Sequence, residues 1–252
     1  MRIVDPCGCF PTGRHYPGIA HLIRVRAVGV AEEIPADSSW VDCVVAFIDV
    51  ETTGREPELD RLVEVGVILG RGGAVFERKS WLINPGIPIP EESTAVHGIR
   101  DADVADKPSF AEVVPEILAM VEGAIPAAYN AVFDKAFLHA ELARAQRTPA
   151  PASGALPPAF RREVEWLDPL VFAREIYRDE QSRALADVAE RLGIQLVRAH
   201  RATDDAEAAL LVLYALAKDQ RLPRAYAALL QEQRRLGRAF DEARRFWRKP
   251  SN

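Results

Sequence analysis

Residues 44–54, VVAFIDVETTG, most constrain what this chain can fold into, because an apolar run leads directly into two acidic residues. Five apolar residues precede Asp49 and Glu51, and a turn signal, Thr52-Thr53-Gly54, closes the segment. A short apolar run that ends at a turn is typical of a buried strand. Since side chains alternate between the faces of a strand, the two acids should point to the same side, with Val50 opposite.

Two carboxylates in such a run are costly to bury, because each loses its hydration and because they repel each other. A cation between them removes both costs, and oxygen-only ligands suit Mg²⁺ or Mn²⁺. The alternative is that the two acids lie at the fraying end of an edge strand, where acidic residues are common. The rest of the sequence has to decide between these interpretations.

The composition limits the class of protein but leaves its substrate open. With 252 residues, 48% hydrophobic and 27% charged, the sequence fits a soluble globular domain with or without appendages. The net charge of −5 neither supports nor excludes a polyanionic substrate, because bound cations would reverse the sign locally. We expect a cytoplasmic protein without a membrane span, since no signal-peptide pattern is visible and three cysteines make no disulfide framework.

Hydrophobic patterns and turn signals predict an α/β domain. Strands are expected at 44–54, 62–69 and 74–83, which would form an antiparallel meander, and further strands at 124–129 and 164–167. Helices are expected at 110–121 (capped by Ser109 with Glu112), at 131–147, after Asp168-Pro169, between Ser182 and Gly193, and at 203–218. We therefore divide the chain into an extension at 1–43, a domain at 44–220 and a tail at 221–252.

The two ends of the chain are less informative. Cys7, Cys9, His15 and His21 offer four zinc ligands, but their spacing matches no standard pattern, so incidental residues of an extension are the alternative. The segment 21–30 has partial strand alternation, and 32–39 has the composition of a linker. The tail carries a net charge of +6 against −11 for the remainder, which predicts a basic helix that is either simply solvated or contacts nucleic acid or a protein partner.

Two further acids lie where apolar segments meet polar ones. Asp134 and Asp205 are each expected in the first turn of a helix, and His200 precedes Asp205 by five residues. Taken singly, such acids are more often favourable partners of the helix dipole than metal ligands, and a lone histidine is more often an ordinary surface residue. The meaning lies in the combination.

In combination, three ordered motifs resemble the DEDDh family of 3′→5′ exonucleases, which includes the proofreading epsilon subunit of bacterial replicative DNA polymerase. The first motif is FIDVETTG, the second is YNAVFDKAFL and the third is HRATDDA, in which spacing favours Asp205 over Asp204. The stretches AVHGI and ADKPSF also look like the proofreading branch. The resemblance covers residues 44–218 and implies an RNase H-like fold, a mixed five-stranded sheet flanked by helices.

The resemblance also implies a two-metal mechanism, in which two Mg²⁺ (or Mn²⁺) ions about 4 Å apart hold the attacking and leaving oxygens. Asp49 would bridge both ions, Glu51 and Asp205 would complete the ligands of the first, and Asp134 would act on the second. His200 would be the general base, since a pKa near 6.5 suits that role. The terminal nucleotide would be held by a group of flanking residues: Thr52, Thr53, His97, Asn130 and Phe133.

The predicted function is metal-dependent removal of nucleoside monophosphates from 3′ ends of single-stranded or frayed DNA, in proofreading or repair. One alternative keeps the chemistry but acts on RNA or short oligonucleotides, because the motifs do not read the sugar. Another is a scaffold module bound to a DNA polymerase through the tail or the N-terminal extension. For Phe133, stacking on a base and packing in the helix core both remain open.

Overall fold

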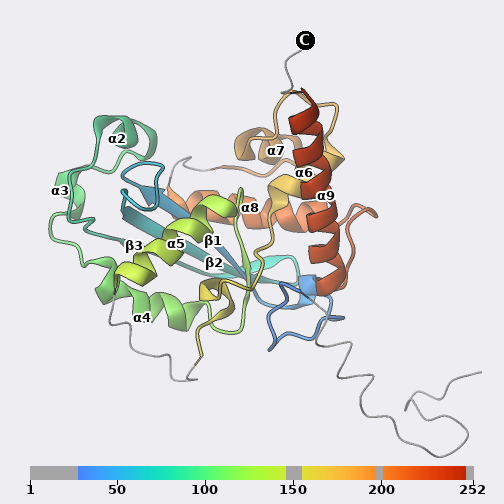
Figure 1. Ribbon diagram of the computed structural model, residues 1–252, viewed down its shortest axis with the longest axis horizontal. Coiled ribbons are helices and arrows are strands. Elements are labelled where there is room, and N and C mark those ends of the chain that lie inside the picture. The colour runs from blue at the N-terminus through green and yellow to red at the C-terminus, as the bar shows by residue number, and fades with distance from the viewer. Residues whose placement is uncertain (1–27, 146–154, 197–200, 248–252) are drawn as a thin grey trace, which may run out of the picture.

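The acidic segment forms an interior strand of a mixed sheet in the computed structural model, which describes residues 28–145, 155–196 and 201–247 (Figure 1). The strands are β1 (Val45–Thr52), β2 (Leu62–Arg71), β3 (Ala74–Leu82) and β4 (Ile125–Ala127), in the order β3-β2-β1-β4. Neighbours β3, β2 and β1 are antiparallel, whereas β4 is parallel to β1. The predicted meander of the first three strands is therefore confirmed.

The predicted fifth strand is reduced to a single parallel bridge, so the expectation of five full strands was wrong. Leu167 pairs with Ala127 alone: the Leu167 N–H donates to the Pro126 carbonyl (2.9 Å), and the Leu167 carbonyl accepts from the Ala128 N–H (3.0 Å). Pairing stops there for two reasons. The Glu165 N–H donates to the Gly29 carbonyl instead (2.8 Å), and Pro169 begins a helix two residues after the bridge.

Helices cover both faces of the sheet, as Figure 1 shows: α4 (Phe110–Met120) and α5 (Val132–Arg144) lie on one side and α8 (Ala202–Leu216) on the other. Two glycines of β2 let α8 approach closely. A Cβ at Gly66 would lie 2.5 Å from the carbonyl carbon of Ala202, and one at Gly70 would lie 2.7 Å from Leu210 Cδ2. The acid-bearing face of β1 is therefore the face on which α8 packs.

The remaining helices surround this core, and none in the described part of the chain is long and apolar enough to cross a membrane. Ser109 and Glu112 form the predicted capping box of α4, and Gly193 has the left-handed φ of +69° expected after a helix. Ser182 does not cap the next helix, because its hydroxyl accepts from the Ala184 N–H and Ala184 is the N-cap. The other helical segments are η1 (Trp40–Asp42), α2 (Glu91–His97), α3 (Asp101–Val104), η2 (Pro158–Phe160), α6 (Pro169–Ile176), α7 (Leu185–Arg191) and α9 (Tyr226–Trp247).

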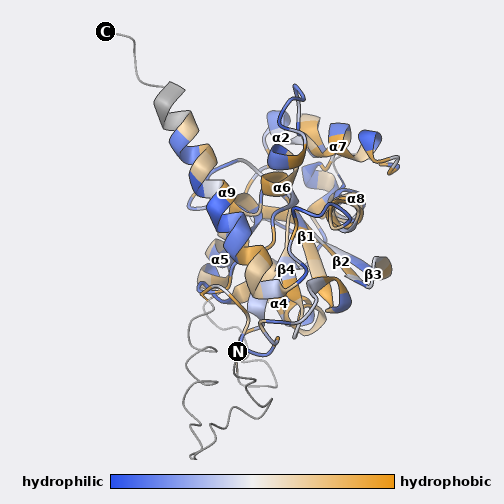
Figure 2. Cartoon of the chain, turned by 90° about the vertical axis from the view of Figure 1, so that its right-hand side faces the viewer, coloured by the Kyte–Doolittle hydropathy of each residue, from blue (hydrophilic) through white to orange (hydrophobic). Residues whose placement is uncertain are grey.

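The segments on either side of the predicted domain contribute to its core. Trp40 is 1% exposed, stacks on Tyr214 with ring centroids 6.2 Å apart, and donates its indole N–H to the Pro223 carbonyl. Helix α9 buries four residues in its first three turns, Tyr226, Leu229, Leu230 and Leu236, and Figure 2 shows its later turns standing away from the other helices. The division at residues 43 and 220 stays a prediction, and the four candidate zinc ligands lie outside the described residues.

Truncating Trp40 tests whether the segment before β1 belongs to the folded unit. Trp40→Ala should lower the free energy of unfolding by about 3 kcal/mol, because a large buried aromatic leaves a cavity. The measurement is urea unfolding followed by circular dichroism. Val28→Ala is the control, since Val28 is 67% exposed and should change stability by less than about 0.5 kcal/mol. Equal stabilities for the two variants would contradict the expectation.

Candidate active site

Three carboxylates predicted as ligands converge at the end of β1. Asp49, Glu51 and Asp205 each offer one oxygen, and these oxygens all lie within 4.8 Å of one another. Asp49 and Glu51 reach this point because they are two residues apart on one face of β1. Asp205 reaches it from the first turn of α8. Side chains more than 150 residues apart in the sequence thus form one cluster.

Asp134 lies beside this cluster but is held differently. The Val50 N–H donates to its carboxylate over 3.1 Å, and only 4% of Asp134 is exposed. Strand β4 pairs with β1 only as far as Phe47, so no strand of the described residues adjoins that edge of β1 beyond this point. Since Val50 follows Val44 by an even number of residues, its N–H points to the same edge where Val44 accepts from Ile125. Asp134 thus takes the place of the missing strand.

Burial and mutual repulsion raise the pKa values of these acids. The pKa of Asp49 is raised well above its usual range, first by burial and then by the charges of Asp134 and Glu51. The pKa of Glu51 is raised to about 8 by burial and by the charges of Asp205 and Glu64, against a smaller lowering by Arg201. The pKa of Asp134 is also raised by burial, although backbone N–H groups oppose this.

The cluster fits a divalent cation on the chemistry of its donors. Carboxylate oxygens alone suit Mg²⁺ or Mn²⁺ better than zinc, which prefers nitrogen and sulfur. Without a cation, bringing these groups together costs free energy, as the raised pKa of Asp49 and Glu51 indicates. The arrangement is therefore an acidic site able to bind metal.

A buried ion pair, which the sequence did not single out, adjoins the cluster. Glu64 on β2 is fully buried, and its carboxylate accepts from Nη2 (3.1 Å) and Nε (3.2 Å) of the Arg201 guanidinium. Glu64 lies directly opposite Glu51 in the strand register. A charged residue within the apolar run LVEVGVIL is the same signal that identified Asp49, so the sequence did contain a clue.

Asp168 is a second residue whose part in the site was missed. Besides capping α6 through the Leu170 N–H (3.0 Å), its carboxylate accepts from the N–H groups of Asn130 (2.9 Å) and Ala131 (3.2 Å). These bonds hold the turn before α5, in which Asn130 has a φ of +69°, a conformation that asparagine tolerates better than most residues. Asp168 thereby helps to orient the first turn of α5, where Asp134 lies.

The residues predicted to hold the nucleotide differ in the contacts that they make within the protein. Thr53 is 1% exposed, and its N–H, carbonyl and hydroxyl all have partners within the protein. Thr52 donates its hydroxyl to the Gly54 carbonyl (2.5 Å), and the buried His97 accepts at Nδ1 from the Ile99 N–H (3.0 Å). The two threonines thus shape the turn after β1.

Phe133 and Asn130 lie at the start of α5. The Phe133 ring is half-buried and packs at 4.8 Å from the ring of Phe137, whereas Asn130 is exposed. Both interpretations of Phe133 therefore remain predictions. His200, the predicted base, lies outside the described residues, although Arg201, the next residue in the sequence, is the N-cap of α8.

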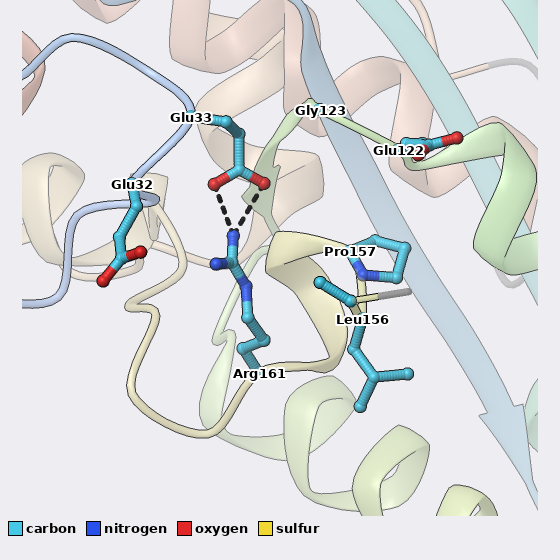
Figure 3. Close-up of a pocket in the computed structure, with 8 residues that line it drawn as sticks. Glu32, Glu33, Glu122, Gly123, Leu156, Pro157 and Arg161 are labelled. Carbon is cyan, nitrogen blue, oxygen red and sulfur yellow. Dashed lines mark hydrogen bonds and ion pairs between the residues drawn. The ribbon is translucent and has the colours of Figure 1, made fainter. Parts of the chain in front are cut away.

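A pocket of 490 Å³ lies at the opposite end of β1. It is lined by residues 32–33, 122–123 and 155–157 and by Arg161, whose guanidinium pairs with Glu33 at 2.6 and 2.7 Å (Figure 3). Residues 122–123 precede β4, which pairs with the beginning of β1. With about 3.3 Å per residue along a strand, this pocket is on the order of 15–20 Å from the acids and is not part of their site.

Comparison with known proteins agrees with this geometry. A family model described as "Exonuclease" matches residues 46–213, from the start of β1 to the last turn of α8. The chain belongs to this exonuclease family. The predicted family is therefore confirmed, and the matched segment contains every described candidate residue of the site.

One sequence relative is DNA polymerase III PolC-type of Thermotoga maritima, which is 31% identical over 195 residues. The match covers 75% of this chain but only 13% of that polymerase, so the chain spans a small part of such relatives. The likeness is to an exonuclease-sized segment inside a much larger protein.

Two solved structures show the same fold. E. coli Exonuclease I in complex with a dA16 oligonucleotide has a TM-score of 0.60 and 20% identity, covering 75% of this chain and 43% of that chain. A 3′-exonuclease described for 3′-end-specific recognition of histone mRNA stem-loop has a TM-score of 0.59 and 17% identity, covering 75% and 68%. The exonuclease domain thus has the expected RNase H-like α/β fold, with four described strands rather than five.

Proposed function

We propose that this exonuclease domain is a Mg²⁺-dependent 3′→5′ exonuclease that removes nucleoside monophosphates from single-stranded or frayed DNA ends. The observation that carries the proposal is the convergence of three carboxylates within 4.8 Å, at the position where the family motifs expect them. Divalent cations bound there would stabilise the charge that develops on the attacking and leaving oxygens. A cytoplasmic location and the use of two ions belong to the same proposal.

The side chains of this domain have separate roles in the proposal. Asp49, Glu51 and Asp205 hold cations and so fix where the scissile phosphate is drawn. Asp134, tied to the Val50 N–H, stays oriented toward Asp49 when the substrate enters. The exposed start of α5, with Asn130 and with Val132 at 80% exposure, provides a surface for the terminal nucleotide.

His200 is proposed to accept the proton of the attacking water. His200→Gln should slow cleavage by about 10²-fold, the usual scale for loss of a general base. Because the carboxylates remain, Mn²⁺ affinity measured by electron paramagnetic resonance should change by less than about twofold. An equal loss of metal affinity and of rate would instead assign His200 to the metal site.

The substrate class is tested with 5′-labelled single-stranded DNA and RNA of equal length, incubated with Mg²⁺. A ladder that shortens from the 3′ end, and that EDTA abolishes, is the expected result, with DNA cut faster than RNA. Both polymers are tested because one solved structure of this fold is described with dA16 and another for recognition of a histone mRNA stem-loop. Faster cutting of RNA would therefore overturn the choice of polymer while leaving the chemistry standing, whereas an endonucleolytic pattern would overturn both.

A second proposal is that the domain works together with a DNA polymerase. It is favoured by the relative in which a similar segment is part of a PolC-type DNA polymerase III. The surface proposed for docking is the later part of α9, where Arg235 and Arg238 are exposed. A truncation near Arg221 is unsuitable as a test, because it would remove buried residues such as Tyr226 and Leu230. Charge reversal at Arg238 is the better test, because this exposed residue can be changed without disturbing the core. The measurement is co-elution of the variant with a replicative polymerase.

A further inference from the structure

An ion pair joins α8, which carries Asp205, to β2, the strand that lies beside the ligand-bearing β1. Glu64 of β2 is fully buried, while the side chain of Arg201, the N-cap of α8, is 41% exposed and reaches inward to it. The two hydrogen bonds, Arg201 Nη2 to Glu64 Oε1 (3.1 Å) and Arg201 Nε to Glu64 Oε2 (3.2 Å), form a bidentate pair. Such a pair fixes orientation as well as distance, because the guanidinium is planar and rigid.

The strand register shows what this pair holds in place. Glu64 is directly opposite Glu51, and Gly66 is directly opposite Asp49, so all four positions are on the face that α8 covers. Arg201 precedes Asp205 by four residues, which is about one helical turn. The ion pair therefore ties the start of α8 to the strand beside Glu51, one turn away from the ligand that α8 supplies.

A close backbone contact at Gly66 is a second, independent link between β2 and the start of α8. A Cβ at this position would lie 2.5 Å from the carbonyl carbon and 2.7 Å from the carbonyl oxygen of Ala202, and 2.7 Å from the Thr203 nitrogen. The backbone of the first turn of α8 thus rests directly on β2, where no side chain intervenes. The contact at Gly66 sets how near the helix comes, and the Glu64–Arg201 pair sets how it is turned.

We propose that Arg201 and Glu64 are positioning residues: they hold the first turn of α8, and with it the Asp205 carboxylate, at metal-binding distance from Asp49 and Glu51. This inference rests on the proposed function, since it assigns the pair a role in forming the metal site. A buried carboxylate could be paired merely to neutralise its charge, so the test has to separate charge balance from positioning.

The chain offers a matched control. Arg78 of β3 pairs with Glu207 of the same helix through two hydrogen bonds, but both side chains are partly exposed, at 51% and 29%. Both pairs join a strand to α8 through a bidentate arginine. Only the Glu64–Arg201 pair is next to the acids, so Arg78→Gln reports the effect of losing an α8 ion pair as such.

The experiment measures Mn²⁺ affinity by electron paramagnetic resonance in folded protein, with circular dichroism as the check of fold. Arg201→Gln should weaken Mn²⁺ binding about 10- to 100-fold, the scale seen when groups that orient metal ligands are lost. Arg78→Gln should stay within about twofold of the wild type. Arg201→Lys keeps the charge but not the two-pronged guanidinium, so its Mn²⁺ affinity should lie between those of the wild type and Arg201→Gln. This variant replaces Arg201→Gln in the test if Arg201→Gln does not fold.

The double variant Glu64→Gln with Arg201→Gln distinguishes the two roles. It removes both charges, so a pair that only balanced charge would regain wild-type Mn²⁺ affinity, and that outcome would overturn the inference. If the pair positions α8, the double variant should be thermally more stable than Arg201→Gln, but its Mn²⁺ affinity should stay at least about tenfold weaker than that of the wild type. Wild-type Mn²⁺ affinity in Arg201→Gln, together with loss of Mn²⁺ binding in Asp205→Asn, would also overturn the positioning role but would leave the proposed function standing. Absence of Mn²⁺ binding by the wild type would overturn the proposed function and the inference with it.

Discussion

Replacing Asp49 by asparagine is expected to lower the rate of 3′-end cleavage at least about 10³-fold while making the metal-free protein more stable. The pKa of Asp49 is raised first by burial and then by repulsion from the charges of Asp134, Glu51 and Asp205. Asparagine keeps the shape of the side chain and removes the charge. The variant therefore loses the central cation ligand but no longer has to bury a carboxyl group among like charges.

The two effects are measured on the same preparation. Cleavage of labelled single-stranded DNA gives the rate, and thermal unfolding in EDTA and in excess Mn²⁺ gives the stability. The wild type should unfold at a higher temperature in Mn²⁺ than in EDTA, and Asp49→Asn should lose most of this difference. Asp42→Asn is the control, because Asp42 is exposed just before β1 and should alter neither quantity. A wild-type rate in Asp49→Asn would remove Asp49 from the chemistry.

The acids could be predicted from the sequence because each stands at a boundary that local rules recognise. Asp49 and Glu51 interrupt an apolar strand, while Asp134 and Asp205 begin helices. The periodicity of a strand alone places Asp49 and Glu51 on one face. Their convergence with residues from α5 and α8 could not be computed from spacing, and it was the ordered motifs of a known family that predicted it.

What the sequence analysis missed lies in contacts between distant residues. The Glu64–Arg201 pair joins positions 137 residues apart, and neither residue's local pattern names its partner. Asp168 was predicted as the start of a helix, but its bonds to the Asn130 and Ala131 N–H groups depend on how α6 meets the turn before α5. Local sequence rules predict that Asp168 caps α6, but they do not predict its contacts with the turn before α5.

The prediction of a fifth strand was wrong for a related reason. The segment 164–167 has strand composition, but a strand also needs a free edge and free backbone groups. Here Glu165 gives its N–H to Gly29, in the segment 21–30, for which the sequence indicated partial strand alternation. Residues before position 44, such as Ala31 and Ile34, are buried with the core. Competition from this flanking segment, invisible in the pattern of 164–167, shortened the strand to one bridge.

Metal binding is expected to strengthen steeply as pH rises, because the cation must displace protons that the site holds. With its pKa raised to about 8, Glu51 is largely protonated at pH 6 in metal-free protein, and the pKa of Asp49 is raised as well. Each proton released adds up to about a tenfold gain in affinity per pH unit. For the Glu51 proton alone, the dissociation constant for Mn²⁺ should therefore fall by up to about 10²-fold between pH 6 and pH 8. A constant affinity over this range would mean that the acids are ionised before the cation arrives.

The stability of the metal-free protein should change in the opposite direction. A carboxyl whose pKa is higher in the folded than in the unfolded state binds more protons when folded, so its contribution is complete below its ordinary value of 4.5 and is lost as pH rises toward about 8. The expected slope is about 1.4 kcal/mol per pH unit for each such proton. Thermal unfolding in EDTA should show a falling midpoint from pH 5 to pH 8, whereas saturating Mn²⁺ should abolish the fall.

Glu51→Gln tests the contribution of Glu51, because it cannot ionise and should lower the slope in EDTA by up to about 1.4 kcal/mol per pH unit. Glu112→Gln is the control for removing a carboxyl, since Glu112 caps α4 and its pKa is lowered rather than raised. In that variant the fall between pH 5 and pH 8 should persist. If Glu51→Gln retained the wild-type slope, the proton taken up on folding would belong to another acid, and Asp49 would be the next to replace. The protons that stabilise the metal-free site at low pH are thus the ones that the cation has to displace.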